Sequence, residues 1–300
     1  MKVTILGNNS ALPAFGRHPT AQAVSVYADL LLIDCGEGTQ VQMQRYGLKW
    51  RNLHHIFISH MHGDHYFGLP GLINSMSLMG RMAPLHLYGP ASLKPILDAI
   101  LQVADTVLSY PLHFYPLPEG SALLVDDPSF TVTCFPVEHR ITCHGFVVQR
   151  KTKGRKLLPL KCVEYGIPTA YYDTLKQGAD YERGDGFLVK NEWVTADGPT
   201  AKRYAYCADT RYTESYMEHI QGADAMYHEC TYLEADADKA VARFHSTAAQ
   251  AAALAVKANV KQLLLGHFSS KYKDLAPFQE EAAAVFPNVS VTVEGIMYDI

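Results

Sequence analysis

Short runs of apolar and β-branched residues recur through the first 60 positions of the chain. They lie at 3–6 (VTIL), 23–27 (AVSVY), 30–34 (LLLID) and 55–59 (HIFIS). Runs of this length, separated by turn residues, predict paired β-strands. The first part of the chain is therefore expected to form a sheet.

Helical and strand-like patterns alternate in the rest of the chain. Apolar residues at helical spacing predict helices at 69–79, 91–104 and 248–258, the last of them capped by Ser246 or Thr247. Further strands are expected at 85–88, 130–135, 203–207, 225–228 and 262–266, around a polar stretch from about 150 to 200. Apolar strands flanked by amphipathic helices predict an α/β fold with sheets covered by helices. A four-layer αβ/βα sandwich and a doubly wound sheet both fit this pattern.

Composition limits the possible classes of protein. With 300 residues, 48% of them hydrophobic, the chain fits one globular domain over 1–300. The start MKVTILGNNS lacks the layout of a signal peptide, and no apolar run approaches the ~18 residues that a membrane span needs, so a cytoplasmic location is expected. Six cysteines without a CxxC pair predict buried thiols rather than disulfides or a zinc ribbon. The formal charge of -4 argues against nucleic-acid binding by an overall positive surface.

The most informative motif directly follows the strand at 55–59. It reads His60-Met61-His62-Gly63-Asp64-His65, which places three imidazoles and a carboxylate on one loop. Neutral imidazole nitrogen and carboxylate oxygen suit borderline cations such as Zn²⁺. Four solvated polar residues on a turn would be an odd choice directly after an apolar strand. The loop is therefore interpreted as a ligand cluster.

Three more candidate ligands also follow strand-like runs. These are His139, Asp209 and His267. A single histidine at a strand end is more often an ordinary loop residue, but together with the ligand loop these residues predict a two-metal site. A carboxylate such as Asp209 can bridge two cations about 3.5 to 4 Å apart, the separation that two-metal hydrolysis uses.

The ligand pattern resembles the metallo-β-lactamase superfamily, and further segments resemble ribonuclease Z. They are LGNNSALPAFGRHP at 6–19, DCGEGTQ at 34–40, SHMHGDHYFGLPGL at 59–72, HSTAAQAA at 245–252 and LLLGHFSSKY at 263–272. The resemblance implies a four-layer sandwich, a homodimer and two zinc ions per chain. By the same resemblance, His60, His62 and His139 hold one zinc ion, Asp64, His65 and His267 hold the other, and Asp209 bridges them.

Chemistry and resemblance together suggest catalytic residues. A ribose 3′ oxygen is a poor leaving group as an alkoxide, so its expulsion needs a proton donor outside the metal ligands. His245, in the HST context of the resemblance, is the candidate donor, and Glu229 could orient it or hold it charged. Asp64 could orient or deprotonate the attacking water besides binding metal. Ser269 is a weaker candidate for binding a phosphate oxygen.

An acidic protein that binds RNA needs a local basic surface. The segment 149–161 holds six basic residues and no acidic one, among them Lys151, Lys153, Arg155 and Lys156. Ribonuclease Z enzymes resemble this arrangement, with an arm that holds the tRNA inserted between the positions of His139 and Asp209. An inserted basic arm is therefore expected at about 149–190, although the family's glycine-proline run is replaced here by Gly166-Ile167-Pro168.

The predicted function is a zinc-dependent endoribonuclease that removes the 3′ trailer of precursor tRNA. Two other functions remain open at this point. Another phosphodiesterase with the same fold, acting on small or cyclic nucleotide esters, would share every metal ligand. A non-catalytic scaffold that binds RNA or a partner is disfavoured, because all seven ligands and a proton donor are present.

Overall fold

The computed structural model describes all residues from 1 to 300, which divide into two compact units. The first unit consists of Met1–Gln149 and Lys202–Ile300, and the second of Arg150–Ala201. The second unit is thus an insertion, and it is longer at its C-terminal end than the 149–190 expected from the sequence. No helix in either unit combines the length and apolar character needed to cross a bilayer.

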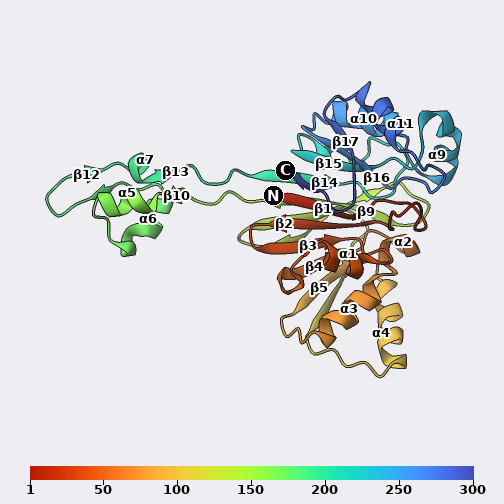
Figure 1. Cartoon of the computed structure of the whole chain (residues 1–300), viewed down its shortest axis with the longest axis horizontal. Helices are drawn as coiled ribbons and strands as arrows, with labels where there is room; N and C mark the ends of the chain where they lie inside the picture. Colours follow the sequence, from red (N-terminus) through yellow and green to blue (C-terminus); the bar gives the residue numbers. More distant parts are fainter. The chain divides into compact units, whose positions relative to one another are not determined.

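Two seven-stranded sheets form the centre of the first unit (Figure 1). In spatial order, the first sheet contains β18 (Met297–Asp299), β1 (Lys2–Gly7), β2 (Ala21–Val26), β3 (Asp29–Ile33), β4 (Leu53–Phe57), β5 (Leu85–Gly89) and β6 (Leu112–Pro116). The second contains β17 (Val289–Val291), β16 (Leu263–Gly266), β15 (Ala225–Glu229), β14 (Lys202–Tyr206), β9 (Cys143–Arg150), β8 (Phe130–Val137) and β7 (Ala122–Asp126). Each sheet has both antiparallel and parallel pairs.

Helices cover the outer faces of both sheets, which makes four layers (Figure 1). On the side of the first sheet lie α1 (Thr39–Arg45), α2 (Gly63–Tyr66), α3 (Leu69–Leu78) and α4 (Leu93–Val103). The remaining helices of this unit are α8 (Met217–Ile220), α9 (Ala237–Arg243), α10 (Ala248–Lys257) and α11 (Ala276–Ala283), with short 3₁₀ turns at Trp50–Asn52 and Glu234–Asp236. The structure confirms the sandwich and excludes the doubly wound alternative, because two separate sheets face each other.

The alternation of side chains along the strands explains how both faces of a sheet are buried. In β3, Leu31 and Ile33 pack in the core that contains residues of both sheets, whereas Leu30 and Leu32 pack in the core beneath the outer helices. Successive side chains of a strand point to opposite faces, so a strand covered on both sides must be apolar throughout. At the start of α10, Thr247 rather than Ser246 is the cap, and it forms a capping box with Gln250.

The second unit has a small core of its own. Its elements are β10 (Lys156–Leu157), α5 (Pro159–Glu164), a 3₁₀ turn (Thr169–Tyr171), α6 (Tyr172–Lys176), β11 (Tyr181–Glu182), β12 (Leu188–Val189), α7 (Asn191–Val194) and β13 (Thr195–Ala196). Two strand pairs, β10 with β13 and β11 with β12, close it. Its buried apolar side chains are Cys162, Ile167, Leu175, Val189 and Val194. The insertion is therefore a folded element rather than an extended loop.

Candidate active site

The loop after β4 brings two of its histidines together with His139, which follows β8. The Nδ1 atom of His62 lies 3.0 Å from Nε2 of His60 and 3.1 Å from Nε2 of His139. The Oδ2 atom of Asp209 lies 3.7 Å from His60 Nε2 and 4.0 Å from His139 Nε2. One ligand atom from each of these four residues lies within 4.8 Å of the others. They form the first metal cluster, which has the donor set of a zinc site.

A second cluster contains Asp64 and His65 of α2 together with His267, which follows β16. The Oδ2 atom of Asp64 lies 3.6 Å from His65 Nε2 and 3.4 Å from His267 Nε2. The Oδ1 atom of Asp209 lies 3.3 Å and 3.2 Å from the same two nitrogens. Asp209 thus turns one oxygen toward each cluster, which is the arrangement of a bridging ligand.

Outward hydrogen bonds orient three of the imidazoles toward the clusters. The outer nitrogen of His139 donates to the Phe244 carbonyl oxygen at 2.9 Å, so the Nε2 of a neutral ring presents a lone pair to the cluster. His65 likewise bonds Asp34 through Nδ1 at 2.8 Å, and His267 bonds Thr231 at 2.9 Å. The Nε2 atoms of His65 and His267 are buried without any hydrogen-bond partner. Burial opposes the charge of His65, but Asp209 and Asp64 raise its pKa well above the ordinary value, so a cation would take the place of a proton on that inward nitrogen. Outer hydrogen bonds of this kind orient metal-binding histidines.

Asp34 lies behind the metal ligands and holds several of their neighbours by hydrogen bonds. This fully buried carboxylate accepts hydrogen bonds from the Ser59 backbone N–H at 2.8 Å, the Ser59 hydroxyl at 2.9 Å and the Tyr206 hydroxyl at 2.6 Å, besides the bond from His65. The Ser59 hydroxyl lies 2.9 Å from Nδ1 of His60. One buried anion therefore fixes the rings of two ligands that belong to different clusters.

Electrostatics favour the ligand forms of the first cluster. Burial, and after it the neighbouring imidazole of His139, lower the pKa of His62 to about 4. Burial also lowers the pKa of His60 and of His139. For Asp209, burial acts to raise the pKa, but His267 and His65 hold it well below its ordinary value. Neutral imidazoles and an ionised carboxylate are the forms that bind a cation.

His245 lies beside both clusters and is held by Glu229. Its Nδ1 is 2.7 Å from Oε1 of Glu229, which is fully buried at the end of β15. Glu229 also accepts hydrogen bonds from the backbone N–H groups of Thr210 and Thr231. Burial alone would lower the pKa of His245, but the Glu229 carboxylate raises it to about 9. The geometry thus keeps a protonated imidazole next to the metal clusters.

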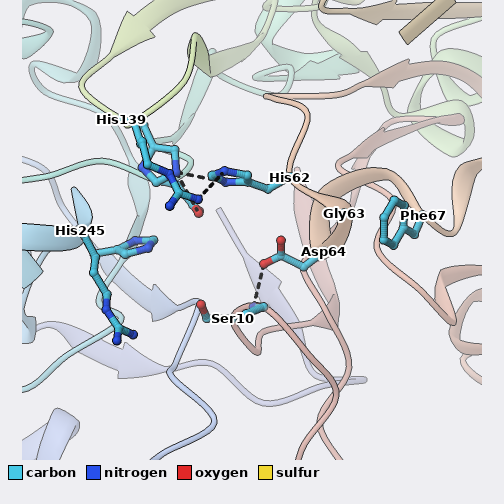
Figure 2. A pocket seen from close by; sticks show the side chains of 11 residues that line it. Ser10, His62, Gly63, Asp64, Phe67, His139 and His245 are labelled. Carbon is cyan, nitrogen blue, oxygen red and sulfur yellow. Dashed lines mark hydrogen bonds and ion pairs between the residues drawn. The ribbon is translucent and has the colours of Figure 1, made fainter. Parts of the chain in front are cut away.

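These groups open into one cavity of about 590 Å³ (Figure 2). Its lining includes His62, Asp64, His139, Asp209 and His245. Asp64 is fixed there by a hydrogen bond from the Ala11 backbone N–H at 2.7 Å, which Figure 2 shows as a dashed line. A cavity of this volume accepts a ligand the size of a nucleotide. A two-metal ligand set and a proton donor on one wall are the elements of phosphodiester hydrolysis.

Comparisons with known proteins identify the family. A family model described as "Anti-Pycsar protein Apyc1" matches residues 1–142. Ribonuclease Z of Parabacteroides distasonis is 40% identical over 299 residues, which cover 99% of this chain and 98% of that protein. The chain belongs to the ribonuclease Z family. The solved structure of human tRNase Z, short form, has a TM-score of 0.73 and 26% identity, and covers 100% of this chain and 99% of its own.

The ribonuclease Z fold is a metallo-β-lactamase fold. The metallo-β-lactamase fold protein YhfI of Bacillus subtilis has a TM-score of 0.68 at 20% identity, and covers 99% of this chain and 98% of its own. This fold implies metal binding, and the two histidine and aspartate clusters fit it.

The structure brings most of the predicted ribonuclease Z site together. All seven predicted ligands lie in the two clusters, and the predicted pair of His245 and Glu229 is hydrogen bonded beside them. Ser269 is not on the cavity wall, and its hydroxyl accepts a hydrogen bond from the backbone N–H of Lys271 in a turn. Within the second unit, Arg155 donates hydrogen bonds to Thr195 at 2.7 Å and Asp197 at 2.8 Å. Its side chain therefore stabilises that unit rather than standing ready to bind RNA.

Sequence reasoning missed several residues of this ribonuclease Z site. Asp34 ends the apolar run of β3, and that position at a strand end was a signal of the same kind that identified Asp209. The glycine that follows Cys35 has a packing role, because a methyl group at Gly36 would lie 2.4 Å from the carbonyl oxygen of Asp64. Phe67, Arg140 and Arg243 also line the cavity, and no spacing pattern in the sequence connects them.

Proposed function

We propose that this protein is a tRNA 3′-processing endoribonuclease that hydrolyses the phosphodiester at the 3′ end of precursor tRNA and releases the trailer. The observation that carries the proposal is the hydrogen-bonded pair of His245 and Glu229 on the wall of the cavity that the metal clusters form. Esters with good leaving groups need no such acid, whereas a ribose 3′ oxygen does. The whole-chain likeness to ribonuclease Z supports the choice of tRNA.

The proposed metals are two zinc ions. His60, His62 and His139 would hold one, Asp64, His65 and His267 the other, and Asp209 would bridge them. When bound, such a pair supplies Lewis acidity that makes water a nucleophile at neutral pH and offsets the charge of the phosphate. The orphaned Nε2 atoms of His65 and His267 support this assignment.

The remaining steps belong to side chains of the chain itself. Asp64 would orient the attacking water and accept its proton. Attack in line with the ribose 3′ oxygen forms a new bond between phosphorus and the water oxygen and breaks the bond to O3′. His245 would donate its proton to O3′ as that bond breaks, while Glu229 keeps the imidazole charged and aligned. The products are a 3′-hydroxyl on the tRNA and a 5′-phosphate on the trailer.

The second unit is the proposed arm for the tRNA body. Nine of the 26 basic and seven of the 30 acidic residues lie in Arg150–Ala201, which leaves this unit at +2 and the rest of the chain at -6. Lys151, Lys153 and Lys156 lie near its start. Each phosphate that a lysine neutralises releases counterions, which gives an acidic protein affinity for RNA.

A homodimer is also proposed, through an apolar face of the first unit. Val41, Leu78, Met79 and Met82 are between 58% and 81% exposed, and a hollow lined by Met79, Met82 and Trp50 lies among them. Exposed apolar groups gathered in one region indicate an interface.

Light scattering on two variants tests the dimer. Leu78→Glu should yield a monomer, whereas Val103→Glu, on the exposed surface of α4, should leave the mass unchanged. A wild-type monomer would contradict the dimer.

A paired-substrate assay tests the proposed function. Zinc-loaded protein is incubated with a 3′-extended precursor tRNA and, separately, with bis(p-nitrophenyl) phosphate. We expect cleavage of the precursor at the end of the mature tRNA. Turnover of the small ester alone would favour the other candidate, a phosphodiesterase for small or cyclic nucleotide esters, which needs the same metal ligands.

A further inference from the structure

One side of the active-site cavity carries an exposed aromatic ring. Phe67 directly follows α2, lines the cavity and is 62% exposed. Figure 2 shows it beside Gly63, with Asp64 between it and His245. A single exposed apolar residue needs no explanation by itself, but this one lies on the wall of the cavity that also contains the metal clusters, where a bound ligand could cover it.

The metal loop holds this ring in place. The backbone N–H of Phe67 donates to the Gly63 carbonyl oxygen at 2.9 Å, which closes one helical turn. A methyl group at residue 63 would lie 2.2 Å from Cε2 of Phe67, so the ring rests directly on the glycine. The Tyr66 ring also packs against it, with the ring centroids 5.0 Å apart and the planes at 67°. Because Phe67 is still 62% exposed after both contacts, part of its ring surface is open to a planar group. Nucleobases stack on aromatic rings in this way whatever their sequence.

Two arginines on the same cavity lack acidic partners. The Nη1 of Arg243, the last residue of α9, donates to the Tyr232 hydroxyl at 3.0 Å, which uses one of the five N–H donors of a guanidinium. The Nη2 of Arg140 lies 3.1 Å from Nε2 of His62. Neither forms an ion pair, whereas nearby Arg211 is paired with Glu138 at 2.6 Å. Unpaired guanidiniums on a cavity wall suit phosphate groups, which they bind with two hydrogen bonds.

We propose that Phe67, Arg140 and Arg243 form a subsite for one unpaired nucleotide next to the cleaved bond. Its base stacks on Phe67, and the arginines bind the phosphates on either side of the scissile one. The inference rests on the proposed function and adds the feature by which the cavity selects RNA that is single-stranded at the cleavage position. A base paired in a duplex has both faces covered and cannot reach the ring.

A coupling experiment tests the stacking. Zinc-loaded wild type, Phe67→Leu and Phe67→Tyr are compared on precursor tRNA that is intact, or abasic at the last tRNA nucleotide or the first trailer nucleotide. At one of these positions, loss of the base should lower kcat/KM of the wild type by about 5- to 150-fold, the usual worth of a stacked base. Phe67→Leu should lose as much on intact RNA and nothing further on that abasic RNA, and Phe67→Tyr should keep most of the activity. If the losses in kcat/KM from Phe67→Leu and from removal of the base multiply at both positions, the ring and the base act independently, and the stacking proposal is wrong.

The same coupling can be measured without cleavage. Dissociation constants are determined for a short single-stranded RNA with and without the base, by fluorescence anisotropy. A wild type that fails to cut precursor tRNA but shows the coupling in Kd would reject the proposed function and keep the subsite. Cleavage of precursor tRNA without coupling in either measurement would support the proposed function and reject the subsite. Tyr115→Leu, an exposed aromatic residue of β6, is the matched control and should show no coupling.

Salt dependence tests the arginines. Arg140→Gln and Arg243→Gln should each reduce the slope of log Kd against log salt by about 0.7, the value for one phosphate of a single strand. Arg45→Gln, at the end of α1 and outside this cavity, should leave the slope unchanged. Zinc content is measured for each variant, because Arg140 contacts His62. An unchanged slope in Arg243→Gln would overturn the phosphate assignment.

Discussion

Replacing His245 by alanine should slow precursor cleavage without releasing metal. The Nδ1 atom of His245 lies 2.7 Å from the fully buried Glu229 carboxylate, which raises the pKa of His245 to about 9 and so favours the protonated ring at pH 7. A positioned general acid contributes about 10² to 10⁴ in rate, which corresponds to about 3 to 5 kcal/mol of transition-state stabilisation. His245→Ala should therefore lower kcat on precursor tRNA by that factor.

The assay compares two leaving groups at constant metal content. A p-nitrophenolate leaves as a stable anion and needs little protonation, so His245→Ala should lower bis(p-nitrophenyl) phosphate turnover far less than precursor cleavage. Zinc is quantified by elemental analysis in the same samples. Equal losses on both substrates would refute the role of general acid. Loss of zinc would instead make His245 a ligand, which its proximity to Asp209 and His267 also permits.

Further predictions concern the groups around this acid. Removing the charge of Glu229 lowers the pKa of His245, so Glu229→Gln should move the alkaline limb of the pH–rate profile down by about 1 to 3 pH units; an unmoved limb would contradict the pairing. Asp209→Ala should deplete both metal positions, and elemental analysis showing one full site would exclude a bridge. Asp34→Asn should weaken metal affinity by about 10- to 100-fold, as other outer-shell changes do, measured by chelator competition against wild type. Alanine at Lys151, Lys153 and Lys156, with Arg155 left intact to preserve the unit, should raise KM for precursor tRNA and flatten its salt dependence, with small-ester turnover as the control.

The layers of the fold could be predicted because the spacing of apolar residues along the chain follows which faces of the strands are buried. The runs at 3–6 and 30–34 are apolar apart from Thr4 and Asp34, and in the structure both faces of β1 and β3 are covered. The edge strands β6, β7, β17 and β18 were missed, because edge strands are short or half exposed and carry mixed sequences such as LHFYP. The inner strand β9 was missed as well, although it is largely buried. Both sheets therefore proved wider than the sequence pattern indicated.

The candidate site was predictable where ligands follow strands. His139, Asp209 and His267 each come just after a strand of the second sheet, and the ends of those strands meet at one edge of it. Phe67, Arg140 and Arg243 gave no such signal, because an exposed aromatic ring or an unpaired arginine is defined by its neighbours in space. The hydrogen bond from Arg155 to Asp197 joins residues 42 positions apart, and composition cannot reveal such a contact.

The chemistry of the cut ends tests the central claim most directly. Precursor tRNA is cleaved by zinc-loaded protein in water enriched in ¹⁸O, and both products are examined by mass spectrometry. Hydrolysis by an external water with protonation of O3′ predicts a 3′-hydroxyl on the tRNA, and one ¹⁸O atom in the 5′-phosphate of the trailer. A 2′,3′-cyclic phosphate on the tRNA, or a trailer without ¹⁸O, would contradict the proposed mechanism.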